Sequence, residues 1–291
     1  MSQNPGRLFL GAAHILKVMF HKRILLSLLL IIVGMLTVYA ASPYTTDFDI
    51  PYTTKTDPLS QSRLKLDIHH PAEATDLPVI VWFHGGGLTG GNKFIPAELM
   101  DHGYVVVAPN YRLIPDTDVT GCIDDAAEAV AWVIQNIDKY GGDPSKVIVS
   151  GHSAGGFLTS MIGLDKSRLG KYGVDADSLA ALVPFSGQVI THFSDRKSQG
   201  IGELTPWIDR NAPLFHVRKD APPYIIVTGD AEQELFGRYE ENLYMWRMMK
   251  LVGHPYVKIY KLDGYNHGDM AAPAHHILLH EANAILSQNK N

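Results

Sequence analysis

Residues 146–157 read Lys-Val-Ile-Val-Ser-Gly-His-Ser-Ala-Gly-Gly-Phe. The β-branched run at 147–149 suits a strand buried on both faces of a parallel sheet. A G-x-S-x-G pentapeptide follows, with Ser153 at its centre, and the next residues favour a helix. A serine on such a sharp strand-to-helix turn has an exposed hydroxyl, and the flanking glycines leave the room that the turn needs. The pentapeptide alone also fits a tight turn with an inactive serine, so a catalytic interpretation depends on partners elsewhere.

Strand-like and helix-like segments alternate through most of the chain. We expect strands over 64–70, 79–83, 104–108, 179–185, 224–228 and 257–262, and helices over 96–102, 124–140, 238–252 and 274–286. This alternation predicts one α/β domain over 41–291, with a mostly parallel sheet covered by helices on both faces. Residues 41–62 are expected to be an extended lead-in. Residues 186–223 lack clear periodicity and are expected to form a short cap-like insertion over the carboxyl edge of the sheet, where ligands bind in such folds.

The charge distribution and the motifs that are missing exclude several classes of function. Residues 1–40 hold four of the 25 basic side chains and no acid, so the body carries 21 basic against 30 acidic side chains. An acidic body without basic stripes argues against nucleic acid as a partner. The single cysteine, Cys122, excludes an internal disulfide and a thiolate metal cluster. The sequence has no phosphate-binding loop, no H-E-x-x-H and no dinucleotide-binding glycine motif, so we expect no cofactor and no metal.

The N-terminal segment has the pattern of a targeting signal. Residues 24–38 form an uninterrupted run of apolar or small residues after two cations. The run is short for a membrane span, which needs about 20 residues, and it suits a secretory signal with small residues at the cleavage site. Residues 1–40 are therefore predicted to be a signal peptide, with translation starting at Met1 or Met19. An uncleaved anchor formed by residues 24–38 is the alternative, and either interpretation places the body outside the cytoplasm, secreted or periplasmic.

Acyl transfer by a serine needs a base and a carboxylate that orients it. His267 is the candidate base, because it is the only one of fourteen histidines in the loop between the last predicted strand and the final helix. The carboxylate is expected after the preceding strand, where Asp230 and Glu232 are both eligible. Asp230 can instead cap the turn. Glu232 stands two residues further out, where the loop can bring it towards His267.

The reaction also needs hydrogen-bond donors for the oxyanion that develops on the substrate. A histidine and three glycines at residues 84–87 directly follow a predicted buried strand. The N–H groups of Gly85 and Gly86 can face the acyl oxygen together with the N–H of Ala154. The histidine of this run is expected to brace the loop, and His152 to be a buried packing residue.

Four motifs together resemble the α/β-hydrolase superfamily: His-Gly-Gly-Gly at 84–87, Asn-Tyr-Arg-Leu at 110–113, Gly-Asp-Pro at 142–144 and Gly-His-Ser-Ala-Gly-Gly at 151–156. The pattern is most similar to the hormone-sensitive-lipase-like and feruloyl-esterase-like carboxylesterases, over roughly residues 60–285. The resemblance implies an α/β-hydrolase fold. It also implies Ser153 as the nucleophile, His267 as the base, and Gly85, Gly86 and Ala154 as the oxyanion hole.

The resemblance also gives a preference between the two acids. In these branches the acid commonly lies three residues after a glycine that ends the strand, and counting from Gly229 selects Glu232 over Asp230. The chain departs from the family in having Glu where Asp is usual, and residues 233–236 do not follow the usual pattern.

The activity that these features predict is hydrolysis of a small carboxylic ester through an acyl-enzyme. Because the insertion at 186–223 is short and polar, we expect short or water-soluble acyl groups, with carbohydrate-linked esters as one option. Two alternatives remain. One is an amide-cleaving relative, such as an aryl formamidase or a small serine peptidase, and the other is a catalytically silent α/β-hydrolase that serves as a binding protein.

Overall fold

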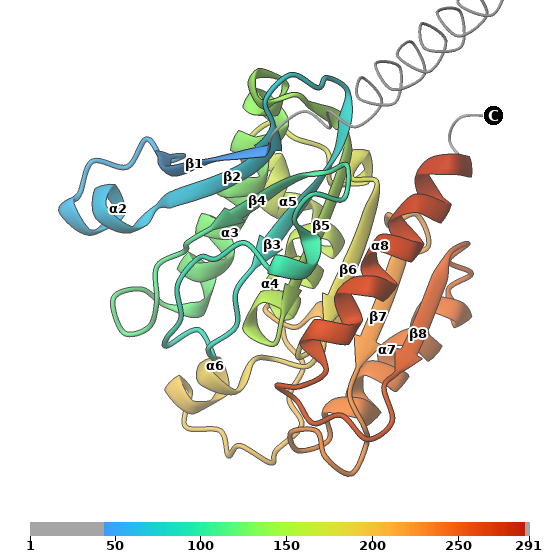
Figure 1. Ribbon diagram of the computed structural model, residues 1–291. Helices are drawn as coiled ribbons and strands as arrows, with labels where there is room; N and C mark the ends of the chain where they lie inside the picture. Colours follow the sequence, from blue (N-terminus) through green and yellow to red (C-terminus); the bar gives the residue numbers. More distant parts are fainter. Residues whose placement is uncertain (1–43, 289–291) are drawn as a thin grey trace, which may run out of the picture. The chain divides into compact units, whose positions relative to one another are not determined.

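The computed structural model describes residues 44–288, and these form a twisted eight-stranded sheet with helices on both faces (Figure 1). The signal peptide, the anchor and the alternative starts all fall outside the described residues. The strands are β1 (Tyr44–Pro51), β2 (Lys65–Pro71), β3 (Leu77–Phe83), β4 (Val105–Pro109), β5 (Gly142–His152), β6 (Ala181–Phe185), β7 (Tyr224–Thr228) and β8 (Val257–Lys261).

The helices are α2 (Pro58–Arg63), α3 (Val119–Asn136), α4 (Ala154–Leu164), α5 (Lys166–Gly170), α6 (Phe193–Ser198), α7 (Arg238–Leu251) and α8 (Ala271–Gln288), with short 3-10 turns η1 (Ala97–Leu99), η2 (Ile137–Tyr140), η3 (Ala176–Ser178) and η4 (Pro213–His216). Within residues 44–288, no helix has both the length and the apolar character needed to cross a membrane.

The strands follow the order β1-β2-β4-β3-β5-β6-β7-β8 across the sheet. All pairings from β4 to β8 are parallel, whereas β2 pairs antiparallel with both β4 and β1. The predicted mostly parallel sheet is therefore confirmed. Strand β1 and helix α2 lie in the segment predicted to be an extended lead-in. Strand β1 was missed because it is an edge strand with a largely exposed, polar sequence and so lacks an apolar signal.

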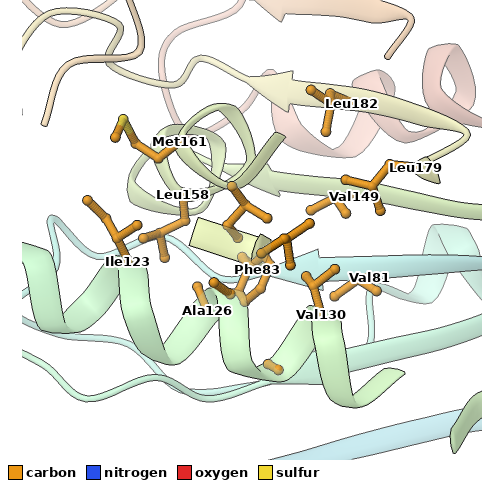
Figure 2. Packing of buried hydrophobic residues seen from close by; sticks show 14 of the residues in the cluster. Val81, Phe83, Ile123, Ala126, Val130, Val149, Leu158, Met161, Leu179 and Leu182 are labelled. Atoms are coloured by element: carbon orange, nitrogen blue, oxygen red, sulfur yellow. The ribbon is translucent and has the colours of Figure 1, made fainter. Parts of the chain in front are cut away.

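Successive residues of the central strand β3 point into two separate cores. Val79, Val81 and Phe83 pack with α3, α4 and α7, whereas Ile80 and Trp82 pack with α8 on the opposite face. Figure 2 shows the first core, in which side chains of α3 and α4 meet those of β3 and β5. Burial of each large aliphatic side chain contributes about 1.5–3 kcal/mol, so a strand buried on both faces is fixed in register.

Two helices depart most from their predicted bounds. Helix α3 begins at Val119 rather than at 124, because the Asp118 side chain accepts the Gly121 N–H and caps the helix five residues earlier than the apolar spacing indicates. The predicted helix over 96–102 is only the short turn η1. Cys122 lies on α3 and is buried.

Parallel strands bring their carboxyl ends to the same edge of the sheet, and the candidate residues gather there. Ser153 follows β5, and the glycine run at 84–87 follows β3. His267 lies in the loop after β8. The insertion at 186–223 packs against this edge, where the Ser194 hydroxyl of α6 donates to the carbonyl of Gly87 at 2.8 Å.

Candidate active site

Ser153 occupies a strained turn between β5 and α4. Its backbone has φ 57° and ψ −114°, in the left-handed region that non-glycine residues rarely adopt. Such a conformation costs on the order of 1–3 kcal/mol and persists only where the surroundings enforce it. The Ser153 N–H is fixed by the carbonyl of Phe185 in the neighbouring strand, at 2.8 Å. The predicted strand-turn-helix context of the pentapeptide is therefore present.

The two glycines of the pentapeptide are required by close packing of the backbone. A Cβ on Gly155 would lie 2.1 Å from the carbonyl oxygen of Phe83, and one on Gly151 would lie 2.7 Å from the same oxygen. Neither distance is possible for real atoms, so only glycine fits at these positions. The pentapeptide is thus explained by the approach of α4 to the end of β3 as well as by the serine itself.

Ser153 and His267 meet as predicted. The distance from the Ser153 Oγ to the His267 Nε2 is 2.9 Å. On the other side of the ring, the His267 Nδ1 lies 2.7 Å from the Glu234 Oε2. Because a carboxylate only accepts hydrogen bonds, the Nδ1 carries the proton and the Nε2 is left free to accept the serine hydroxyl. The Ser153 hydroxyl, the His267 imidazole and the Glu234 carboxylate therefore form one continuous hydrogen-bonded triad.

The predicted acid has to be corrected, because the carboxylate that contacts His267 is Glu234 and not Glu232 or Asp230. Asp230 closes a turn: its carbonyl accepts the Glu234 N–H at 2.9 Å, and its Oδ1 accepts the Glu232 N–H at 2.9 Å. This turn leaves Glu232 exposed and brings Glu234 back to the end of β7. Asp230 also binds the N–H of Gly264 through its Oδ2 at 2.7 Å, so it ties the acid loop to the histidine loop.

The Glu234 carboxylate is buried and receives several hydrogen bonds. Its Oε1 accepts from the Gly229 N–H at 3.0 Å and from the Ser186 hydroxyl, and its Oε2 accepts from the Leu235 N–H at 3.1 Å. Burial alone would raise the pKa of this carboxyl, but the hydrogen bonds from His267 and Ser186, together with the attraction of the imidazole, outweigh it and lower the pKa to about 2. Glu234 is therefore ionised throughout the neutral range.

Ser186 is a site residue that the sequence did not reveal. It follows β6 with φ 46°, and besides Glu234 its hydroxyl lies 3.2 Å from the His267 Nδ1. Its carbonyl accepts a hydrogen bond from the buried guanidinium of Arg238 at the start of α7. A Ser-Gly pair after a strand is common in turns, so nothing in the local sequence marks this residue.

His152 was predicted to be a packing residue, and the structure adds a polar contact. Its Nε2 lies 2.7 Å from the backbone carbonyl of His267, so the ring donates a hydrogen bond to the histidine loop. The two rings also pack together, with centroids 4.7 Å apart. Burial, followed by the repulsion of His267, lowers the pKa of His152 to about 4. The ring is therefore neutral near pH 7.

The glycine run lies beside the serine. A Cβ on Gly85 would lie 3.4 Å from the Cβ of Ser153, whereas one on Gly86, at φ +114°, would lie 2.2 Å from the carbonyl oxygen of Gly90. Ala154 is the first residue of α4, where N–H groups have no partner within the helix. Gly85 thus lies close to Ser153, and its N–H and that of Ala154 remain the predicted donors to the oxyanion.

His84 braces the glycine run, in agreement with its predicted role. Its ring stacks on Tyr111 with centroids 4.4 Å apart, and its Nδ1 donates to the carbonyl of Gly85 at 2.7 Å. The Tyr111 hydroxyl donates to the carbonyl of His84 at 2.9 Å. Burial lowers the pKa of His84 to about 4, so the ring is neutral near pH 7 and its place is structural.

The arrangement can carry out nucleophilic substitution at a carbonyl carbon. The His267 Nε2 lies within hydrogen-bond distance of the Ser153 hydroxyl and can take its proton, and a buried carboxylate stabilises the imidazolium that results. Among residues 44–288, no group of three or more His, Cys, Asp or Glu side chains is placed to bind a metal ion.

The fold and the Ser-His-Glu line define a protein of the α/β-hydrolase fold. The BD-FAE family model matches residues 66–244, and the chain belongs to the BD-FAE family. The resemblance to the α/β-hydrolase superfamily is therefore confirmed.

Curated relatives include a probable carboxylic ester hydrolase, LipM of Mycobacterium tuberculosis, which is 33% identical over 52% of this chain and 40% of its own length. Cocaine esterase of Oryctolagus cuniculus is 38% identical over 53% of this chain and 31% of its own length. The chain thus spans less than half of the length of either relative.

Two solved structures share the fold. A truncated carbohydrate esterase from gut microbiota superposes with a TM-score of 0.71 at 20% identity, covering 84% of this chain and 98% of that one. Esterase 2 of Thermogutta terrifontis, phosphonylated by sarin, has a TM-score of 0.65 at 25% identity, covering 84% of this chain and 94% of that one.

Proposed function

We propose that the protein is a serine hydrolase that cleaves small carboxylic esters through an acyl-enzyme. The Ser153 Oγ attacks the carbonyl carbon while its proton moves to the His267 Nε2. The carbonyl oxygen of the substrate becomes negative and accepts hydrogen bonds from the N–H groups of Gly85, Gly86 and Ala154. As the C–O bond to the alcohol breaks, His267 returns the proton to the leaving oxygen. Water then repeats the sequence on the acyl-enzyme and releases the acid and the free serine.

The observation that carries this proposal is the unbroken line from the Ser153 Oγ through both nitrogens of His267 to Glu234. A structural serine needs neither a basic partner nor a buried carboxylate behind it. The ionised Glu234 holds the proton of His267 on the Nδ1 and so keeps the Nε2 available for catalysis. The relatives named as ester hydrolases support an ester as the substrate class.

We also propose that the body acts outside the cytoplasm. The support for this is the apolar run at 24–38 with basic residues before it and small residues after it. The mature N-terminus of the native protein, read by sequencing, tests this proposal. Cleavage after residue 40 agrees with a signal peptide, and retention of residues 24–38 agrees with the anchor.

Hydrolysis of 4-nitrophenyl acetate by wild type and by Ser153→Ala is the direct test of the ester hydrolase. We expect kcat/KM to fall at least about 10³-fold in the variant. Parallel formanilide and aminoacyl substrates separate an esterase from an amide-cleaving enzyme. Equal rates in the two proteins, or an absence of hydrolysis in wild type, would reject the proposal and favour a catalytically silent binding protein.

A further inference from the structure

An apolar cavity opens between the insertion at 186–223 and the segment that follows Glu234. It has a volume of about 490 Å³, within the range of small-molecule sites. Its apolar walls come from the insertion and from the segment that leads into α7, namely Ile190, Leu204, Ile208, Leu214, Phe236 and Tyr244. Side chains distant in the sequence therefore enclose one space at the carboxyl edge of the sheet.

A second hollow, with a volume of about 240 Å³, shares several walls with this cavity. The two share Gln188, Arg196, Glu203 and Phe236 as walls, and the second adds Phe193, Leu235 and Arg238. Phe193 adjoins the glycine run, and Leu235 directly follows Glu234 in the acid loop. A Cβ on Gly87 would lie 3.0 Å from the Phe193 ring.

The Leu235 N–H binds the Glu234 carboxylate. The space therefore runs from the glycine run and the acid loop out to Phe236.

Most charged groups around the cavity are already used within the protein. The Glu241 carboxylate accepts hydrogen bonds from the N–H groups of Val189 and Ile190. It also forms an ion pair with Arg238 at 2.9 Å. The Arg196 guanidinium donates to the carbonyls of residues 203 and 205 and so fixes the turn that carries Leu204. Glu203 and Glu240 stand at the exposed rim. The surface left for a ligand is therefore mainly apolar.

Two of the apolar walls are unusually exposed. Phe236 is 76% and Leu204 75% exposed. Large apolar side chains that gather at a concave surface mark a ligand or partner site more often than chance exposure does. Because this surface continues into the catalytic loops, a substrate group is the occupant that the geometry favours.

We infer that this cavity binds a bulky apolar group of the ester substrate. This inference rests on the proposed ester hydrolase and narrows its substrate class. The expectation of short or water-soluble acyl groups assumed a polar insertion, whereas residues 190, 204, 208 and 214 make it apolar where it faces the cavity. A short acyl group remains compatible with the cavity if the bulky group belongs to the alcohol.

Three esters can distinguish a bulky acyl group from a bulky alcohol group. Their hydrolysis is measured as the release of acid. Methyl acetate reports on the triad alone, methyl octanoate adds a bulky acyl group, and 1-naphthyl acetate adds a bulky alcohol. Phe236→Ala is the test variant. Phe215→Ala is the matched control, since Phe215 is 62% exposed on the same insertion and does not line the cavity.

We expect Phe236→Ala to lower kcat/KM for one of the two bulky esters about tenfold more than for methyl acetate, mainly through KM. Phe215→Ala should change none of the three. Ser153-dependent hydrolysis of all three esters with no selective effect of Phe236→Ala would overturn the inference while leaving the ester hydrolase intact. A change in sedimentation of Phe236→Ala, with kcat/KM for the bulky esters unaltered, would overturn it in favour of self-association. Absence of Ser153-dependent hydrolysis of any ester would instead reject the proposed function.

Discussion

The serine turn and the acid loop contribute to the same triad, yet they are specified by the chain in opposite ways. The turn at 151–155 is enforced by backbone packing, since the carbonyl of Phe83 leaves room only for glycine at two positions. The loop at 229–236 is fixed by a network of hydrogen bonds, in which the carbonyl and carboxylate of Asp230 close the turn and the hydroxyl of Ser186, just after β6, meets Glu234. Where backbone packing leaves no room for a Cβ, the residue must be glycine, and the sequence shows this directly. A hydrogen-bond network sets the positions of the side chains but does not by itself specify their residue types.

The largest effect on stability is expected from a substitution of Gly155 in the serine turn. Gly155→Ala would place a Cβ 2.1 Å from the carbonyl oxygen of Phe83, and neither backbone can move freely. We expect the free energy of unfolding to fall by about 3 kcal/mol or the protein to be insoluble, as urea denaturation or soluble yield can show. Gly170→Ala is the control, because a Cβ there meets open space. Equal stability of the two variants would contradict the packing argument.

The acid loop should respond to pH instead. The pKa of Glu234 is lowered from 4.5 to about 2 on folding, so the unfolded chain binds more protons at this carboxyl between those values. Its contribution to stability is complete above pH 4.5 and is lost as the pH falls towards 2. After allowance for solvent screening, because the residues next to Glu234 are exposed, wild type should lose about 1–2 kcal/mol more than Glu234→Gln between neutral pH and pH 3. Parallel losses in urea titrations of the two proteins would show that the carboxylate is not stabilised by folding.

A smaller effect is expected where the serine turn meets the histidine loop. His152 belongs to the serine turn, and its Nε2–H donates to the carbonyl of His267. His152→Phe keeps an aromatic ring and removes the donor, so His267 should lose part of its alignment. We expect kcat for 4-nitrophenyl acetate to fall about fivefold with KM unchanged. A rise in KM alone, or a loss of folded protein that matches the loss in rate, would indicate a packing role only.

Much of the fold and part of the site were predictable from the sequence. The buried strands, and Ser153 and His267 as partners, follow from local patterns and from chain order, because parallel strands force their carboxyl ends to one edge. Glu234 was not predictable in this way. The count from Gly229 assumed a three-residue turn, but hydrogen bonds to the Asp230 carbonyl and carboxylate lengthen the path to five residues. Ser186 was not predictable either, because its hydrogen-bond partner Glu234 lies 48 residues away in the sequence.

The central claim is that Ser153, His267 and Glu234 act as one unit, and the most direct test compares Glu234→Gln with Glu232→Gln. Both remove one negative charge from the same loop, but only Glu234 contacts the imidazole. We expect kcat for 4-nitrophenyl acetate to fall about 10³- to 10⁴-fold in Glu234→Gln and to stay within about twofold of wild type in Glu232→Gln. Loss of activity in Glu232→Gln with activity retained in Glu234→Gln would contradict it.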